Sequence, residues 1–479
     1  MDLRISRRII QNFSSITIFS ILGQVVGIFT SVKVTQILGV TNYGLLAFAQ
    51  SLVSLFLVIS NGGMRHVVVR NIVIDPVLGT IRSIFKTSLK IKLVITFSSL
   101  ILFSLYFKSV VLVNGYKDIY WFVILMICLG SFLDIIESIA AGIERMWQTA
   151  ALSFFLNLLW CGILLLGNTD YFFLTSILEI SLILRILHII FLSLWIYKLL
   201  PPVEKVHREN SNVSVTNFFK SFRPFYITAI FSAIQIQVPI LFLQMNSSVN
   251  EVSYFSLSSK ILGPFQLVLF TLLQTTYPYL VRLADRNINF FFESMQKYLR
   301  FFLFISVSIA CTFSLMSKEI VMFIYGIEFI SSVEVIELQV WYFVYLVNFS
   351  LLGLSLSSTS MEKNLSKLAI SYALISVIIA YVFSFNGAKD LSFSYLLSAT
   401  IAFSYHVYFV HKWSKGGFAF RTLFGSLLVL IMFPYGFPYC MKILDFTFVV
   451  RFSISVLLLS LCVLLSLSMF KTAFQYSQK

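Results

Sequence analysis

Eight charged or titratable side chains interrupt the apolar stretches of this 479-residue chain. A charge at the centre of a bilayer costs at least ~2.5–3.5 kcal/mol on insertion scales, so such residues are usually paired or functional. The chemistry open to these residue types is anion binding, proton transfer and internal ion pairing. The eight residues are Lys33, Asp134, Glu137, Glu179, Arg185, His188, Lys260 and Arg451.

Two pairs among them have helical spacing. Arg185 and His188 are three residues apart and share a helix face, with Glu179 one and a half turns earlier. Because histidine titrates near neutral pH, these three could form a substrate site or a proton relay, or a satisfied polar cluster between helices. Asp134 and Glu137 also share a face. They could serve as counter-ions for Lys33 or Arg185, or carry protons, and pairing is favoured.

The elements that position these residues are membrane-spanning helices, which need about 20 apolar residues each. Fourteen stretches of the sequence qualify. We expect spans at 10–38, 43–62, 93–113, 119–142, 149–167, 171–196, 224–246, 253–277, 300–316, 333–358, 368–386, 391–410, 422–440 and 447–470.

Basic residues predict the orientation of these spans. If the N-terminus is cytoplasmic, roughly 26 Lys and Arg residues fall on the cytoplasmic side, including those of the connection from Arg65 to Lys92, and about 5 fall on the other. The imbalance predicts a multi-pass protein with both termini in the cytoplasm. The opposite connections are too short to fold as a domain, the longest being 317–332.

Composition excludes several classes of protein. Hydrophobic residues make up 58% of the chain and charged residues only 11%, which a soluble fold could not bury. The net charge of +15 follows from topology, so we expect no nucleic-acid partner. The five cysteines are scattered, and no metal, nucleotide or hydrolytic motif is present, so we expect no catalytic residues, no metal site and no cofactor.

A weak internal repeat indicates two halves. The first two spans are joined by 38–44 and lead to Arg65 and Arg70, and the seventh and eighth are joined by 246–254 and lead to Arg282 and Arg286. Six spans separate the two units, which predicts two six-helix lobes of like orientation. The expected domains are an N-terminal lobe at 1–200, a cytoplasmic linker at 201–223, a C-terminal lobe at 224–411 and two further helices with a cytoplasmic tail at 412–479.

Four stretches carry a resemblance to a known family. They are Gln36–Gly44, Gly142–Met146, Glu251–Lys260 and Ile324–Phe329. In their order and spacing the chain resembles the polysaccharide (O-antigen-type) flippases of the multidrug/oligosaccharidyl-lipid/polysaccharide exporter superfamily. The resemblance implies an all-α polytopic membrane protein with a MATE-like fold of about fourteen transmembrane helices, as two six-helix pseudo-symmetric lobes plus two C-terminal helices.

The same resemblance implies a function. Such a protein moves an undecaprenyl-pyrophosphate-linked oligosaccharide from the cytoplasmic to the periplasmic leaflet of a bacterial inner membrane by alternating access, without ATP. The expected setting is O-antigen and lipopolysaccharide biosynthesis. The expected partners are the undecaprenyl-pyrophosphate-linked glycan, membrane lipid, and a polysaccharide polymerase with its chain-length partner.

The resemblance also suggests roles for individual cations. Lys33 and Lys260 would line a central cavity, where positive charge lowers the cost of moving a pyrophosphate through hydrocarbon. Lys33 could instead extend to the interface, since Gly39 is six residues away. Arg65 and Arg70 could recruit the pyrophosphate, although topology alone explains them. Related proteins often carry an acidic residue in the seventh helix, where this chain has glutamines.

Two other functions remain open at the level of sequence. A polysaccharide polymerase or ligase of the same pathway would need a sizeable periplasmic loop. A drug/cation antiporter of the same superfamily would need an excess of carboxylates inside the membrane, where this chain has an excess of cations.

Overall fold

The computed structural model describes most of the chain as helix. The described residues are 3–62, 64–74, 78–110, 117–143, 145–167, 172–199, 215–359, 361–414, 420–444, 447–458 and 460–461. No strand occurs in these ranges. The chain divides into two compact units, Met1–Met245 and Asn246–Lys479, here called unit 1 and unit 2.

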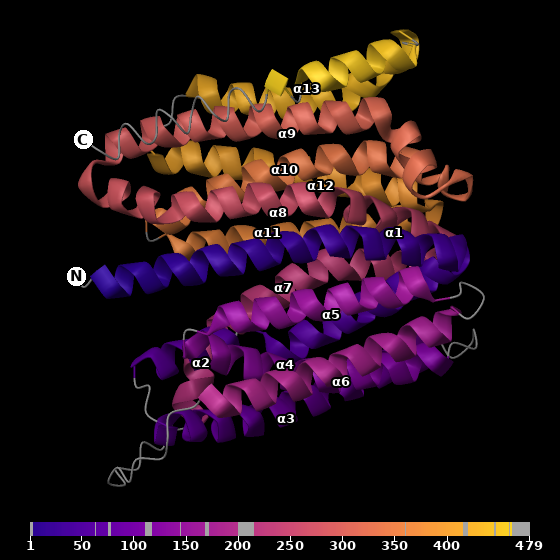
Figure 1. Cartoon of the computed structure of the whole chain (residues 1–479). Helices are drawn as coiled ribbons and strands as arrows, with labels where there is room; N and C mark the ends of the chain where they lie inside the picture. The colour runs from indigo at the N-terminus through magenta and orange to yellow at the C-terminus, as the bar shows by residue number, and fades with distance from the viewer. Residues whose placement is uncertain are drawn as a thin grey trace. The chain divides into compact units, whose positions relative to one another are not determined.

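Figure 1 shows the helices, which are described unit by unit. Unit 1 contains α1 (Leu3–Asn61), α2 (Met64–Ile74), α3 (Leu78–Val110), α4 (Lys117–Gly142), α5 (Met146–Leu166), α6 (Leu174–Leu199) and all but the last residue of α7 (Val215–Asn246). Unit 2 contains α8 (Val249–Arg286), α9 (Ile288–Ile324), α10 (Ser332–Ser358), α11 (Glu362–Phe383), α12 (Ala388–Ser414), α13 (Phe420–Leu444) and a final helix over Phe448–Leu458.

The helices confirm that the chain is a polytopic, all-α membrane protein. Among the described residues, eleven helices are long and apolar enough to cross a membrane. One of them, α1, contains the first two predicted spans, and two shorter apolar helices, Thr422–Pro434 and Phe448–Leu458, lie where the last two are predicted. Each of the fourteen predicted spans therefore overlaps a helix segment, although residues 462–479 lie outside the described part.

The two spans inside α1 meet at Gly39. Its backbone has φ 65° and ψ −176°, a conformation that is accessible almost only to glycine. Figure 1 shows that the chain reverses direction at this end of α1. Leu38 and Tyr43 on either side are buried and anchor the turn to unit 1, whereas Thr41 and Asn42 between them are exposed.

Several helices extend well beyond the expected spans, and in two of them the added turns contain residues that matter below. The third span is predicted to begin at residue 93, but α3 begins at Leu78 and its apolar part at Ile81, so Lys92 lies in the helix and not in a connection. The ninth span is predicted at 300–316, but α9 continues to Ile324 and includes Glu319. In both cases the helix continues past the end of the apolar stretch, and its extra turns contain polar residues.

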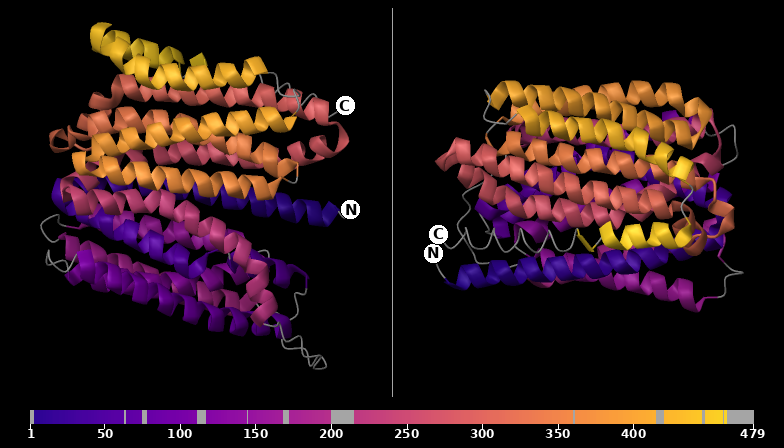
Figure 2. Two further views of the ribbon diagram at one scale, coloured as in Figure 1. Left: turned by 180° about the vertical axis from the view of Figure 1, so that it is seen from behind. Right: turned by 90° about the horizontal axis from the view of Figure 1, so that it is seen from above.

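One helix lies at the centre of each unit. In unit 1, α4 packs against α1, α2, α3, α5 and α6. In unit 2, α10 packs against α8, α9, α11, α12 and α13, and both views of Figure 2 show these helices side by side. The two central helices are the fourth and the tenth predicted spans, so they hold equivalent places six spans apart. This arrangement supports the internal repeat.

The domain boundaries of the sequence analysis stay predictions. The expected linker at 201–223 falls partly on residues 200–214, which lie outside the described part. The division into compact units falls after Met245, near the end of α7, instead of within that linker.

The 251–260 stretch has a structural role at its beginning. Ser248 caps α8 by accepting a hydrogen bond from the Glu251 backbone N–H at 3.4 Å. The Glu251 carboxylate in turn accepts one from the Ala388 backbone N–H at 2.7 Å, at the start of α12. Gly387, at φ 100°, brings the backbone this close, since a Cβ there would lie 3.0 Å from the carboxylate. Glu251 therefore fixes the ends of α8 and α12 together.

We predict that Gly39→Ala destabilises the protein. An alanine at this φ and ψ would be strained by about 1–3 kcal/mol. The midpoint of thermal unfolding of the purified protein in detergent should fall accordingly. Gly27→Ala is the control, because it lies in the same helix and a Cβ there would meet nothing within 4 Å. Equal midpoints for the two variants would contradict the importance of the turn.

Candidate functional site

Six titratable side chains from four helices of unit 1 form a cluster, here called the ionic cluster. Arg65 comes from α2, Lys92 from α3, Asp134 and Glu137 from α4, and Arg185 and His188 from α6. All but Arg65 lie within helices long and apolar enough to span a membrane. The cluster therefore brings several charges from apolar helices together within one compact unit.

The most deeply buried contact is the ion pair between Lys92 and Asp134. The Lys92 ammonium donates to a carboxylate oxygen of Asp134 at 2.5 Å, and the lysine side chain is only 2% exposed. The Ser138 hydroxyl donates to the backbone carbonyl of Asp134 one turn further on. A buried ammonium requires such a partner, because an isolated charge in a dry interior is far more costly than a paired one.

Glu137 connects the other cations of the cluster. Its carboxylate lies 3.7 Å from the Arg65 guanidinium, and it interacts electrostatically with Arg185 and with Lys92. The Arg65 pair is loose, since 3.7 Å exceeds ordinary hydrogen-bond distance and the arginine is 44% exposed. A single carboxylate thus serves several cations, none of which it fully neutralises.

Arg185 and His188 complete the cluster from α6. Their charges interact, as expected for residues three apart on one helix. His188 is buried, and among the described residues its Nε2 has no hydrogen-bond partner. The histidine therefore retains an unused donor or acceptor next to a guanidinium.

An apolar core holds the four helices in this arrangement. Buried residues of α2, α3, α4 and α6 pack together, and several adjoin the ionic cluster in sequence, among them Met64, Ile91, Leu133 and Ile136. In α2, α3 and α4, apolar residues of this core thus lie next in sequence to the charged residues of the cluster. Burial of the apolar residues fixes the helices closely enough for the charges to meet.

A polar stripe continues the cluster through unit 1. Ser60 of α1 shares hydrogen bonds with Thr96 of α3 at 2.6 Å and with Ser131 of α4 at 2.5 Å. Thr96 is one turn beyond Lys92, and Ser131 lies three residues before Asp134. The interior faces of α3 and α4 are therefore polar over more than two turns.

The ionic cluster carries a surplus of positive charge. Arg65, Lys92 and Arg185 face two carboxylates, and His188 adds a polar ring. Guanidinium groups have five donors and match phosphate oxygens in geometry. The chemistry that this arrangement supports is binding of an anionic group, with Glu137 as the internal anion that such a group could replace.

The structure unites five of the eight predicted substrate-binding and counter-ion residues of unit 1 and leaves three apart. Arg65, Glu137, Arg185 and His188 meet, and Asp134 joins them through Lys92. Three predicted residues make no ion pair with any described residue, namely Arg70 and Glu179, which are exposed, and Lys33, which is half-buried on α1.

Lys260 lies in unit 2, apart from the ionic cluster. It is exposed on α8 and makes no ion pair with the described residues. The expected cavity lined by Lys33 and Lys260 involves both units and stays a prediction. The other intramembrane cation of unit 2, Arg451, forms an ion pair with Glu319 of α9 at 2.9 Å.

Lys92 is the member of the cluster that the sequence analysis missed. It was assigned to a basic connection because Arg82, Lys86 and Lys90 precede it. The missed signal is the spacing of Ser88, Lys92, Thr96 and Ser99, which places four polar residues on one helix face. Such a face predicts that the helix begins well before residue 93.

A second polar feature lies in unit 2, between α10, α11 and α12. His406 is fully buried, and within the described part of the chain neither ring nitrogen has a hydrogen-bond partner. It borders a cavity of about 290 Å³ with Phe349, Tyr372 and Tyr405. No group of three or more potential metal ligands occurs among the described residues.

Comparison with known proteins identifies the family. The sequence profile of the polysaccharide biosynthesis protein family matches residues 9–284. The chain therefore belongs to that family. No curated protein matches the sequence.

Solved structures identify the fold. The lipid II flippase MurJ in its inward closed conformation is similar over 96% of this chain and 99% of its own, with a TM-score of 0.68 and 16% identity. An inward-facing multidrug resistance MATE family transporter of the MOP superfamily is similar over 82% of this chain and 96% of its own, with a TM-score of 0.63 and 11% identity. These likenesses confirm the predicted MATE-like fold.

We predict strong coupling between Lys92 and Asp134. Either Lys92→Met or Asp134→Asn leaves one buried charge unpaired and should destabilise unit 1 by about 3–5 kcal/mol, whereas the double variant should recover most of that loss. Thermal unfolding of the four purified proteins would measure the coupling. Lys90→Met, an exposed position two residues away on α3, should change little. Additive effects in the double variant would show that the pair is not coupled.

Proposed function

We propose that this protein moves a lipid-linked saccharide between the two leaflets of a membrane, without catalysing a covalent step. The substrate that fits best is an oligosaccharide on a polyprenyl pyrophosphate, specifically undecaprenyl pyrophosphate, moved from the cytoplasmic to the periplasmic leaflet of a bacterial inner membrane. The termini would then be cytoplasmic. A role in O-antigen or lipopolysaccharide synthesis is the expected setting.

The observation that carries this proposal is the cationic surplus of the ionic cluster. All its members except Arg65 lie on helices long and apolar enough to span a membrane, where each unpaired charge is costly. A protein retains such charges only if an anion compensates them for part of its working cycle. Membership of the polysaccharide biosynthesis family and a fold shared with a lipid II flippase both support a lipid-linked saccharide as the source of that anion.

The physical problem of the transport step is the pyrophosphate. It carries two or more negative charges, which hydrocarbon does not solvate, whereas the glycan can remain hydrated and the polyprenyl chain can remain in lipid. Cations at intermediate depth lower the barrier for the phosphates alone. Arginine adds paired hydrogen bonds to phosphate oxygens, and lysine binds as a point charge that releases its ligand readily.

The internal anion Glu137 gives the cluster a means of exchange. Without substrate it compensates Arg65 loosely and Arg185 electrostatically. An arriving phosphate would compete for both guanidinium groups and displace the carboxylate. When the substrate leaves, Glu137 would restore the internal pairing and lower the cost of the empty site.

The remaining predicted cations extend this path. Lys33 belongs to the first predicted span, on α1, and Lys260 to the eighth, on α8, and neither has an ion-pair partner among the described residues. We propose that they bind the pyrophosphate in the central cavity implied by the family resemblance. Arg70, exposed on α2, would attract it at the membrane surface.

Deletion of the gene tests the class of function. We predict that lipid-linked repeat units accumulate in the leaflet where they are made, and that surface polysaccharide is lost. Leaflet location can be measured by the accessibility of the glycan to an impermeant lectin or oxidant on spheroplasts. If single repeat units instead reach the outer face, the protein is a polymerase or ligase and the proposal is wrong.

Substitutions of single cations test the site. Arg185→Gln, Lys33→Ala and Lys260→Ala should each reduce surface polysaccharide by about tenfold, the effect of losing one charge-assisted hydrogen bond to phosphate. Protein levels in the membrane should stay normal. Arg82→Gln, an exposed arginine of α3 outside the ionic cluster, is the matched control. Normal polysaccharide in all three variants would exclude a cationic path.

A further inference from the structure

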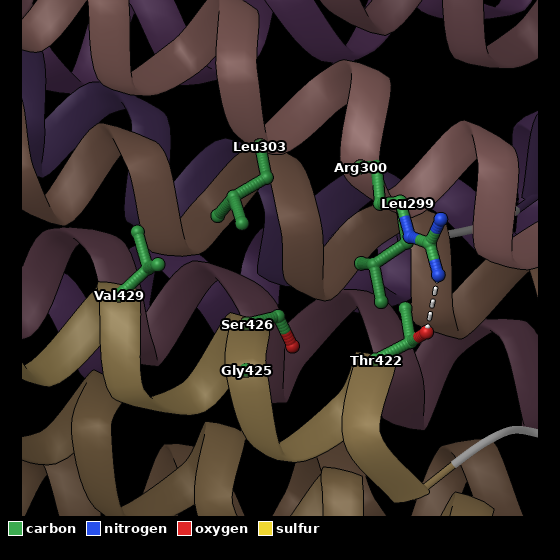
Figure 3. Close-up of a pocket in the computed structure, with 7 residues that line it drawn as sticks. All are labelled: Leu299, Arg300, Leu303, Thr422, Gly425, Ser426 and Val429. Atoms are coloured by element: carbon green, nitrogen blue, oxygen red, sulfur yellow. Dashed lines mark hydrogen bonds between the residues drawn. The ribbon is translucent and has the colours of Figure 1, made fainter.

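A pocket of about 550 Å³ lies in unit 2 between α9 and α13 (Figure 3). Leu299, Arg300 and Leu303 line it from α9, and Thr422, Gly425, Ser426 and Val429 line it from α13. The ionic cluster of unit 1 contributes nothing to it. One end of the pocket is polar and the other is apolar, which is the pattern expected for an amphiphilic ligand.

One end of the pocket is polar and positively charged. The Arg300 guanidinium donates to the Thr422 hydroxyl at 2.9 Å, and that hydroxyl donates to Gln296 at 3.3 Å. This chain of hydrogen bonds holds the exposed arginine at the rim. Among the described residues, Arg300 forms no ion pair, and its guanidinium, which has five donors, makes one hydrogen bond, to Thr422.

The other end of the pocket is apolar and open. Figure 3 shows Leu303 and Val429 at the opposite end from Arg300 and Thr422, about one to two helical turns along the two helices. Gly425 lies between these ends on α13, and a Cβ there would meet nothing within 4 Å. The missing side chain leaves room for a flexible chain against the helix backbone.

The surroundings match the boundary between lipid headgroups and acyl chains. At the polar end, the exposed Arg300 guanidinium provides positive charge at the rim of the pocket. The outward face of α13 exposes Phe424, Leu428 and Met432, as expected for a helix in contact with lipid. Anionic headgroups concentrate at such basic rims.

We propose that this pocket binds an anionic glycerophospholipid of the surrounding bilayer. The phosphate contacts the Arg300 guanidinium and the Thr422 hydroxyl, and one acyl chain passes Gly425 toward Leu303 and Val429. A single guanidinium matches the single negative charge of a phosphodiester better than a pyrophosphate. The bound lipid fills the space between α9 and α13 and ties the two helices together. This site is independent of the proposed transport function.

Native mass spectrometry of the delipidated, full-length protein tests the proposal. Dioleoyl-phosphatidylglycerol should bind about tenfold more tightly than dioleoyl-phosphatidylcholine, which has the same chains, because only the former presents an uncompensated phosphate to the arginine. Arg300→Gln should abolish this preference, and Arg300→Lys should retain part of it. Gly425→Leu, which fills the middle of the pocket, should weaken binding of both lipids.

Lys297→Gln is the matched control. Lys297 lies three residues before Arg300 on α9, is exposed, and pairs with Glu293 at 2.8 Å outside the pocket. If Lys297→Gln and Arg300→Gln lowered the preference for phosphatidylglycerol equally, general surface charge would explain the preference, and the proposal would be overturned. Unchanged binding of both lipids to Gly425→Leu would also overturn the proposal. A polyprenyl phosphate that displaces phosphatidylglycerol at equal concentration would assign the site to the transported lipid instead.

Discussion

The cost of a charge in hydrocarbon is the constraint on which the rest of unit 1 depends. Lys92 is almost fully enclosed on α3, and among the described residues only Asp134 of α4 forms an ion pair with it. Sliding α3 against α4 by one turn would separate the two by roughly 5 Å and leave both charges unpaired. The pair therefore fixes the register of these helices more strictly than the surrounding apolar contacts, which tolerate small shifts.

The same constraint helps to explain why the ionic cluster contains more cations than carboxylates. If the cluster served stability alone, equal numbers of cations and carboxylates would cost least, and apolar residues would cost less still. Instead Glu137 is shared among several cations, and its contact with Arg65 is long. Incomplete neutralisation is unfavourable for a structural element but is what a binding site for an anion requires. The charge imbalance is thus better explained by function than by folding.

Hydropathy was sufficient to predict where the helices lie, because each span must satisfy its backbone hydrogen bonds internally and present apolar side chains to the lipid. It failed at α3 and α9, where polar turns such as those around Lys92 and Glu319 are helical. The spacing of Arg185 and His188 correctly indicated a shared face. Which helices bring partners together could not be predicted, since the Lys92–Asp134 contact depends on packing between segments 42 residues apart.

The two central helices show where the duplicated scaffold diverges. In unit 2, the buried polar residues of α10 are neutral: Ser258 donates to Gln339, whose amide donates to Ser392 at 3.2 Å, and the Asn348 amide donates to Ser306 at the same distance. In unit 1, α4 carries Asp134 and Glu137 at its interior positions instead. Amides can satisfy one another without external ions, whereas the carboxylates of α4 are matched to a larger set of cations. Both helices need polar contacts to lock their neighbours, but only α4 organises surplus charge. Among the described residues, the cluster of interior carboxylates with an excess of cations around them therefore lies in unit 1.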